Sequence, residues 1–190
     1  MLESLRTPLE DGEVRIARRD GVARYPARFL LVLAANPCPC APAKDVDCVC
    51  TPVVRRRYLG KLSGPLIDRV DLRVEMQSSA AGMFTPQAGE SSEQVRSRVA
   101  AARAAAAHRW REFGWATNGE VPGHLLRQRY RPPRESLADL EDWLRRGQIT
   151  ARGAARAVRV AWTLCDLRGG EVPSRDDVAA ALNFRERGNR

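Results

Sequence analysis

Hydrophobic positions follow two different periods along the chain, and the first 77 residues favour strands. Phe29–Ala35 is a continuous apolar run with the length and composition of a strand buried on both faces. Val70–Met76 alternates apolar and polar residues, which predicts a short strand. Residues 13–27 alternate around an Asp-Gly pair, which is typical of a β-hairpin. Leu2–Gly12 has the leucine spacing of the end of an amphipathic helix, with glycine as its stop.

Beyond residue 92 the apolar positions change to a helical period. Capping residues, glycines and prolines predict helices over 92–111, 122–130, 136–146, 150–168 and 174–182. Residues 78–92, by contrast, are small, polar and irregular, which is typical of a linker. The pattern therefore predicts a strand-containing domain at 1–77, a linker at 78–92 and a small all-α domain at 93–190.

Composition and charge narrow the class of partner. With 44% hydrophobic and 29% charged residues the chain suits a soluble globular protein. No apolar run approaches a membrane span or forms a secretory signal, so we expect a cytoplasmic protein with no membrane partner. The formal net charge is +9, and all cations but Lys44 and Lys61 are arginines, which suits phosphates of nucleotides or nucleic acid. The alternative for most of these arginines is a solvated face without a site.

Four of the five cysteines are closely paired in sequence. Cys38 and Cys40 are followed, after a gap of seven residues, by Cys48 and Cys50. Four thiolates suit tetrahedral zinc and leave no open position for catalysis. We therefore expect a structural zinc site, with four free thiols as the alternative. The fifth cysteine, Cys165, falls at an apolar helical position and is expected in the core.

Two motifs give the chain a specific resemblance. The apolar run ends in Asn36-Pro-Cys-Pro-Cys40, and Ser63-Gly-Pro-Leu-Ile-Asp-Arg-Val-Asp71 follows. From about Leu2 to the C-terminal region the chain resembles a magnesium-chelatase-like AAA+ ATPase of the ComM/YifB type. The resemblance implies an α/β fold, in which a partial P-loop NTPase core is followed by a small all-α lid bundle. No Gly-x-x-x-x-Gly-Lys-Ser/Thr loop occurs in the sequence, and no strand ends in an acidic pair before residue 29, so we expect this core to lack its Walker A and Walker B half.

The resemblance also implies roles for three polar side chains. Asn36 matches the first sensor, whose amide positions the attacking water at the γ-phosphate, although an isolated Asn-Pro pair would indicate a turn. Arg69 matches the arginine finger that reaches a neighbouring subunit's nucleotide, and the alternative is a surface salt bridge to Asp68 or Asp71. Arg152 matches the second sensor, in the first turn of a capped helix, and the alternative is a solvated helix face.

The function and partners implied by the resemblance are those of an assembled machine. Proteins of this family bind ATP and Mg²⁺ in rings of their own subunits, here expected to be a hexamer, and the ComM type remodels DNA during recombination. We expect this chain to contribute sensors and a finger to such a machine and not to hydrolyse ATP alone. The arginine-rich hairpin matches a loop aimed at the central pore, although edge strands also carry charge to avoid aggregation. The family often has glycine where this chain has Ala41, which predicts local strain after the second cysteine.

A second hypothesis belongs to a different class, a stand-alone, zinc-stapled, basic module that binds nucleic acid. It depends on the cysteine spacing and the arginine content rather than on the resemblance. Salt-dependent binding of DNA by the chain would support it.

Overall fold

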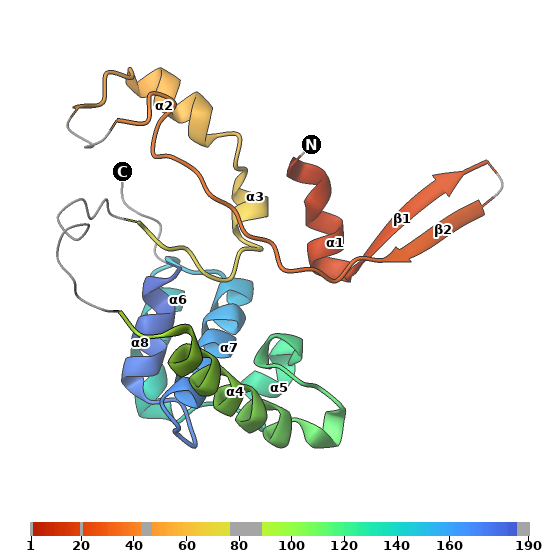
Figure 1. The fold of residues 1–190 in the computed structure, drawn as a ribbon, viewed down its shortest axis with the longest axis vertical. Coiled ribbons are helices and arrows are strands. Elements are labelled where there is room, and N and C mark those ends of the chain that lie inside the picture. Colours follow the sequence, from red (N-terminus) through yellow and green to blue (C-terminus); the bar gives the residue numbers. More distant parts are fainter. Residues whose placement is uncertain (1, 20, 43–46, 77–88, 186–190) are drawn as a thin grey trace. The chain divides into compact units, whose positions relative to one another are not determined.

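The computed structural model describes residues 2–19, 21–42, 47–76 and 89–185, and the chain divides into two compact units. The first unit is formed by Met1–Val70 and Met76. The second is formed by Asp71–Glu75 together with the helices that begin at residue 92. Figure 1 shows the helices and strands of both. No helix in the described ranges is long and apolar enough to cross a membrane.

A short helix opens the first unit and ends at the predicted glycine. The 3₁₀ turn η1 (Leu2–Leu5) leads into α1 (Arg6–Asp11). Gly12 follows with a φ of 69°, a left-handed conformation that glycine adopts without a steric penalty. Its N–H donates to the carbonyl of Pro8 at 2.9 Å and so closes the last turn. The helix end predicted from the leucine spacing is confirmed.

The predicted hairpin follows directly. Strands β1 (Glu13–Arg18) and β2 (Gly21–Pro26) pair in antiparallel register, with Val14 opposite Tyr25. Every residue of β2 is exposed, so in the described structure neither face of the hairpin is covered. Asp20, part of the predicted Asp-Gly turn, lies outside the described residues.

Two short helices complete the first unit. Thr51 caps α2 (Pro52–Leu59), and Ser63 caps α3 (Gly64–Ile67). Each cap oxygen accepts a backbone N–H of the first turn, and each helix has a proline at its start, where the missing N–H costs nothing. Neither helix was predicted, although the cap-and-proline pairs were the signal available in the sequence. Leu66 of α3 is fully buried.

The buried strand predicted at Phe29–Ala35 is wrong for the described structure. The segment is not part of a ladder, and Leu30 and Val32 are 90% and 80% exposed. A strand needs a neighbour to complete its backbone hydrogen bonds, and in the described residues the only ladder joins β1 to β2. The sheet of the expected α/β core is therefore represented here by the hairpin alone.

The short strand predicted at Val70–Met76 is also wrong, for a different reason. Asp71–Glu75 belongs to the second unit and packs against it. The backbone N–H of Arg73 donates to the carbonyl of Phe184 at 3.0 Å, and the side chain of Arg185 donates to the same segment. The backbone polar groups of this segment are thus satisfied by the end of a helical bundle instead of a sheet.

The second unit is the predicted helical bundle. Its elements are α4 (Ser92–Arg109), η4 (Arg111–Phe113), η5 (Asn118–Glu120), α5 (Gly123–Arg127), η6 (Arg134–Leu137), α6 (Ala138–Arg145), α7 (Ala151–Leu167) and α8 (Arg175–Asn183). All of the predicted helices are present, and Thr150 and Ser174 cap α7 and α8 as predicted. Helix α4 is capped by Ser91 instead of Ser92, because Ser91 forms a capping box with Gln94. Most of the predicted linker lies outside the described residues.

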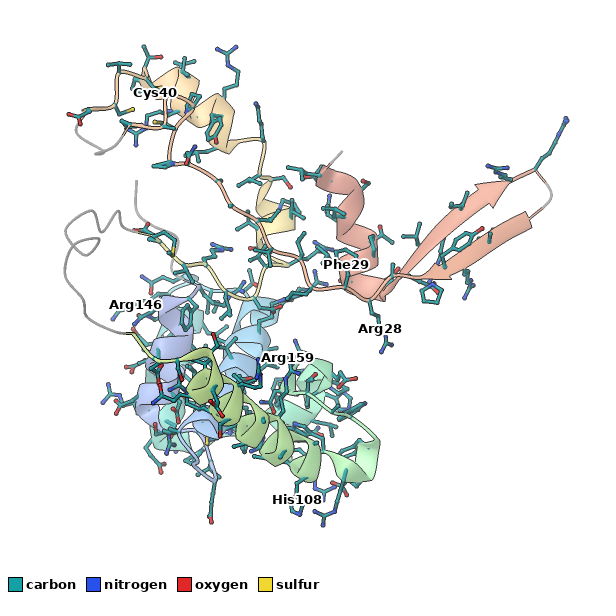
Figure 2. The ribbon with its side chains drawn as sticks, viewed as in Figure 1. Arg28, Phe29, Cys40, His108, Arg146 and Arg159 are labelled. Carbon is teal, nitrogen blue, oxygen red and sulfur yellow. The ribbon has the colours of Figure 1, made fainter. Side chains whose placement is uncertain are left out.

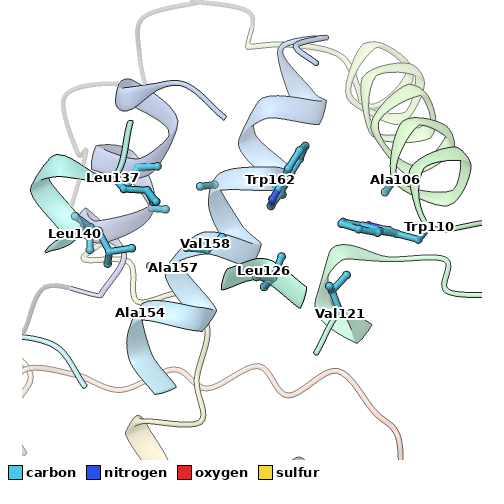
Figure 3. Close-up of a cluster of buried hydrophobic side chains, with 14 residues drawn as sticks. Ala106, Trp110, Val121, Leu126, Leu137, Leu140, Ala154, Ala157, Val158 and Trp162 are labelled. Carbon is cyan, nitrogen blue, oxygen red and sulfur yellow. The ribbon is translucent and has the colours of Figure 1, made fainter. Parts of the chain in front are cut away.

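Helix α7 carries much of the core of the second unit. Figure 3 shows Trp162 and Val158 of α7 in one cluster with Trp110 and Val121 from the preceding segments. Trp110 and Val121 are fully buried, and the rings of Trp110 and Trp162 meet edge to face at 6.1 Å. Cys165 is fully buried as predicted, and burial raises the pKa of its thiol. The helical period in the sequence therefore identified a real core.

Candidate functional site

The four paired cysteines meet in space. Their Sγ atoms all lie within 4.8 Å of one another. Cys38 Sγ is 3.2 Å from Cys40 Sγ and 3.4 Å from Cys48 Sγ, and Cys40 and Cys48 are 3.7 Å apart. Tetrahedral zinc, with Zn–S bonds of about 2.3 Å, places its sulfurs about 3.8 Å apart. The cluster, which includes Cys50, can therefore hold a metal ion with only small movements of its side chains.

The loop that carries the first cysteine pair is a tight turn. The N–H of Ala41 donates to the carbonyl of Cys38 at 3.3 Å, and Ala41 has a φ of 46°. It is the one non-glycine residue with a positive φ in the described ranges, a conformation that costs a residue with a Cβ about 1–2 kcal/mol. The strain predicted at this position is confirmed. Cys38 is buried, whereas Cys40 is exposed on the loop (Figure 2).

Asn36 is exposed and lies two residues before this turn. Its predicted place was the carboxyl end of a buried strand, at the edge where α/β sheets bind ligands. Since the preceding run has no strand beside it in the described structure, that edge is not formed there. The sensor role of Asn36 stays a prediction.

Arg69 is held within the first unit by two contacts. Its guanidinium forms an ion pair with Glu10 of α1, and Nη1 donates to the carbonyl of Pro65 at 2.8 Å. The side chain is only 10% exposed. Glu10 lies 59 residues earlier in the chain, and nothing in the sequence pairs the two residues. The finger role remains a prediction, and in this conformation the guanidinium contacts its own chain.

Arg152 is exposed in the first turn of α7, in the second unit. The start of this helix is fixed by Thr150, whose Oγ1 accepts the N–H of Gly153 at 3.0 Å. The predicted cap at Thr150, which fixes where the helix begins, is confirmed. Its role as second sensor is a prediction that this geometry leaves untested.

Two further arginines follow Arg152 along the helix. Arg156 forms an ion pair with Asp71 at 2.5 Å, and Nε of Arg159 donates to the carbonyl of Val121 at 2.9 Å. Burial lowers the pKa of the Arg159 guanidinium, and the positive charge of Arg156 lowers it further (Figure 2). The N-terminal half of α7 therefore carries three arginines, one of which is paired with the carboxylate of Asp71.

A buried polar network in the second unit was missed by sequence reasoning. Arg109 forms an ion pair with Asp166 of α7, whose side chain is 1% exposed. Asn118 accepts from Trp110 Nε1 at 2.8 Å and donates to Asp166 Oδ2 at 2.9 Å. The guanidinium of Arg109 also lies 4.2 Å from the ring centre of Trp162. The sequence signal that could have revealed this network is Asp166, an aspartate one turn after Trp162 on the buried face of α7.

Comparison with protein families gives two matches. The model for magnesium chelatase, subunit ChlI, matches residues 1–83, and the model for the ChlI C-terminal region matches residues 89–185. The change from one model to the other falls in the segment where the sequence predicts a linker.

Curated relatives match nearly the whole chain. The Mycobacterium tuberculosis (strain H37Rv) protein Rv2897c is 61% identical over 189 residues, which cover 100% of this chain and 38% of that protein. YifB of Escherichia coli is 34% identical over 187 residues, covering 97% of this chain and 36% of YifB. The competence protein ComM of Haemophilus influenzae is 32% identical over 191 residues, with the same coverage of 97% and 36%. The chain thus spans little more than a third of the length of these relatives.

Proposed function

Because the chain belongs to the magnesium chelatase ChlI family, as its two motifs predicted, we propose that it supplies the distal part of an AAA+ ATPase site. In this proposal Asn36 is the first sensor, Arg152 is the second sensor, and Arg69 is a finger that acts on a neighbouring subunit. The nucleotide is ATP with Mg²⁺, the assembly is a ring of like subunits, and the machine acts on DNA. The sequence has no Gly-x-x-x-x-Gly-Lys-Ser/Thr loop, so the chain alone should not hydrolyse ATP.

The observation that carries this proposal is the cationic start of α7. Arg152 is exposed in its first turn, and Arg156 is already bound to a carboxylate, the side chain of Asp71. A helix start offers unpaired N–H groups and a positive dipole, both of which favour phosphate. A triphosphate at this position would meet Arg152 directly and would compete with Asp71 for Arg156. Arg159, which is labelled in Figure 2, lies on the same helix.

Arg69 suits the role of an arginine finger, because a planar guanidinium neutralises the charge that develops on a phosphoryl group during transfer. In the chain its partner is Glu10, an anion of the same sign as phosphate. To act on a second subunit, the side chain must exchange Glu10 for the nucleotide. The finger therefore works only in an assembly that brings a phosphate within its reach.

The test uses a chimera in which this chain replaces the matching 38% of Rv2897c. Steady-state ATP hydrolysis is measured for the parent, for the chimera, and for chimeras with Asn36→Ala, Arg69→Ala or Arg152→Ala. We expect Arg69→Ala to lower the rate about 10³-fold or more, as loss of a finger does in GTPases. The matched control is Arg57→Ala, an exposed arginine on α2, which should leave the rate within about twofold.

Mixing two inactive chimeras tests whether the finger acts between subunits. Arg69→Ala retains its own sensor, and Asn36→Ala retains its finger, so a mixture should recover a measurable part of the activity. A mixture that stays as inactive as its components contradicts action in trans. Magnesium-dependent hydrolysis by the isolated chain, abolished by Arg152→Ala, contradicts the assignment of this chain as an incomplete site.

The cysteine cluster supports a second proposal, a structural zinc ion bound by Cys38, Cys40, Cys48 and Cys50. The separations of 3.2–3.7 Å among the sulfurs of Cys38, Cys40 and Cys48, with Cys50 Sγ within 4.8 Å of each, are close to those of a tetrahedral S₄ site, and Cys38 is buried. Zinc there would join the Ala41 turn to the start of α2.

Metal content and cobalt absorption test the zinc site. We expect one zinc per chain by elemental analysis, and intense absorption typical of tetrahedral thiolate when cobalt replaces it. Cys40→Ser should weaken metal retention, whereas Cys165→Ser should not, because Cys165 lies in the core of the other unit. Native protein with no bound metal and four freely titrating cluster thiols would refute the site.

A further inference from the structure

Positive charge in the second unit is concentrated in its first part. Residues 92–131 contain eight arginines and three glutamates, whereas residues 132–185 contain nine arginines and eight acidic residues. The cationic part includes α4, η4, η5 and α5. A polyanion that binds the α4–α5 part therefore meets a net positive charge, whereas the charges of residues 132–185 nearly cancel.

An aromatic pair lies within this cationic part. Phe113 and Trp115 stack with ring centres 4.6 Å apart and planes 14° apart, and both rings are half-buried. Tyr130 meets Phe113 edge-on at 6.2 Å. The inner sides of the three rings pack against the core cluster, so the stack is anchored while part of its surface faces solvent. An anchored, partly exposed aromatic stack can accept another planar ring.

Two exposed arginines lie near the stacked pair, one by a ring contact and one by its place in the sequence. The guanidinium of Arg129 lies 5.9 Å from the ring centre of Phe113 and is 60% exposed. It is paired at 2.8 Å with Glu112, which also accepts the hydroxyl of Tyr130 at 2.6 Å. Arg111 is exposed and is the first residue of η4. Its Nη1 lies 2.8 Å from Nε2 of His108, at the C-terminal end of α4 (Figure 2).

The loop that presents Trp115 is fixed by its own hydrogen bonds. Glu120 Oε2 accepts the N–H groups of Ala116 and Thr117, both at 2.9 Å. Gly114 takes a left-handed φ of 69° that ends η4 and turns the chain toward Trp115. A ring presented on a fixed loop loses little conformational freedom on binding, which favours affinity.

We propose that this aromatic surface, defined by Arg111, Phe113, Trp115 and Arg129, binds single-stranded nucleic acid. A base stacks on the exposed part of the Phe113–Trp115 pair, and the two arginines contact the flanking phosphates. Stacking requires a base that is not already stacked in a duplex, and every base has a ring face, so the surface selects single strands without selecting sequence. The proposal refines the DNA role in the proposed function, but it requires no nucleotide hydrolysis.

Fluorescence anisotropy with a labelled twenty-nucleotide oligothymidine and the full chain tests the surface. Base–aromatic stacking predicts that Trp115→Leu weakens binding about 5- to 150-fold, and that Trp115→Phe retains most of it. Arg111→Ala with Arg129→Ala should weaken binding and reduce the slope of log affinity against log salt by about 0.7 for each phosphate that is no longer neutralised. A duplex of equal length should bind more weakly than the single strand.

Matched controls separate this surface from general attraction to a basic protein. The side chains of Arg145 and Arg146 are 74% and 66% exposed and lie at the C-terminal end of α6, outside residues 92–131. Arg145→Ala with Arg146→Ala removes the same charge and should change affinity less than twofold. Circular dichroism melting checks that each variant is folded, and the double arginine variants alter only exposed side chains. Equal losses in both double variants, or equal affinity for duplex and single strand, would overturn the proposal. Since ATP hydrolysis is not measured, its failure and that of the ATPase proposal are distinguishable.

Discussion

The two units place their large hydrophobic residues in opposite ways. In the second unit Trp110, Trp162 and Val178 are buried in one cluster. In the described part of the first unit, Leu66 is buried, but most large apolar side chains are exposed, including Val14, Ile16, Val22, Tyr25, Phe29, Leu30, Val32, Leu33, Val49, Val53 and Leu59. A helix satisfies its own backbone and needs only side-chain packing, whereas a buried strand also needs neighbouring strands. The described part of the first unit therefore buries few of its large apolar side chains, whereas the second unit gathers its own into one cluster.

Removal of the metal should produce the largest difference in stability between the two units. Structural zinc in small domains contributes about 10–16 kcal/mol of binding free energy. We expect chelation of the loaded protein to abolish hydrogen-exchange protection in residues 47–59 of the first unit. Protection in α7 should be unchanged, because the cluster cysteines all belong to the first unit.

Cys165→Ala is the control for this experiment. It removes a thiol from the second unit and should leave the response to chelation intact. Equal loss of protection in both units would contradict the independence of their cores, and no loss in either would contradict a structural metal.

Asp166→Ala should produce the largest effect confined to the second unit. The substitution leaves the 14% exposed Arg109 guanidinium without its carboxylate and removes an acceptor from Asn118. Breaking a buried pair from one side costs about 3–5 kcal/mol. We expect the urea concentration at the midpoint of unfolding, measured by tryptophan fluorescence, to fall by an amount that corresponds to this loss of stability. Metal binding by the cluster cysteines should be unchanged.

Two further variants test whether the unpaired buried charge of Arg109 causes this destabilisation. Asp142→Ala removes the partner of the exposed Arg145 and Arg146 and should cost about 1 kcal/mol or less. Asp166→Leu combined with Arg109→Met removes both buried charges and should recover much of the stability. If the double variant is as unstable as Asp166→Ala, the unpaired charge is not the cause.

How much the sequence could predict also differs between the units. Helix starts at Thr150 and Ser174 were predictable because a cap acts on amides of its own first turn, which are local in sequence. The exposed, unpaired backbone of Phe29–Ala35 was not predictable, because an apolar run becomes a buried strand only where segments distant in the sequence pair with it. The distance between residues along the chain also decided which parts of the candidate site could be predicted. The cysteine cluster follows from close spacing, but the pairing of Arg69 with Glu10 joins residues 59 positions apart.

Ala41→Gly tests the local strain in the first unit. A left-handed alanine costs about 1–2 kcal/mol, and the greater chain entropy of unfolded glycine offsets about 0.5–1 kcal/mol. We therefore expect a net stabilisation of about 0.5–1 kcal/mol, seen as a few-fold tighter metal affinity in competition with a chelator. Ala35→Gly, at a position without a positive φ, should give no such gain. An equal gain in both variants would show that flexibility, not relief of strain, is responsible.

The stabilisation that Asp177 provides is expected to depend on pH and to disappear in acid. Burial by itself would raise the pKa of Asp177, but hydrogen bonds from Arg168 and Ser174 outweigh burial and bring the pKa below its ordinary value of 3.8. A carboxylate whose pKa is lower in the folded state stabilises the fold above its unfolded pKa, and that stability is lost as pH falls through the folded pKa. Asp177→Asn should therefore cost about 1 kcal/mol at neutral pH, through the weakened α8 cap, and progressively less below about pH 4. Asp139→Asn, at an exposed pair with Arg175, should change the urea midpoint little at any pH. Parallel midpoint curves for the wild type and Asp177→Asn between pH 7 and about pH 2.5 would exclude Asp177 as the acid-sensitive group of the second unit.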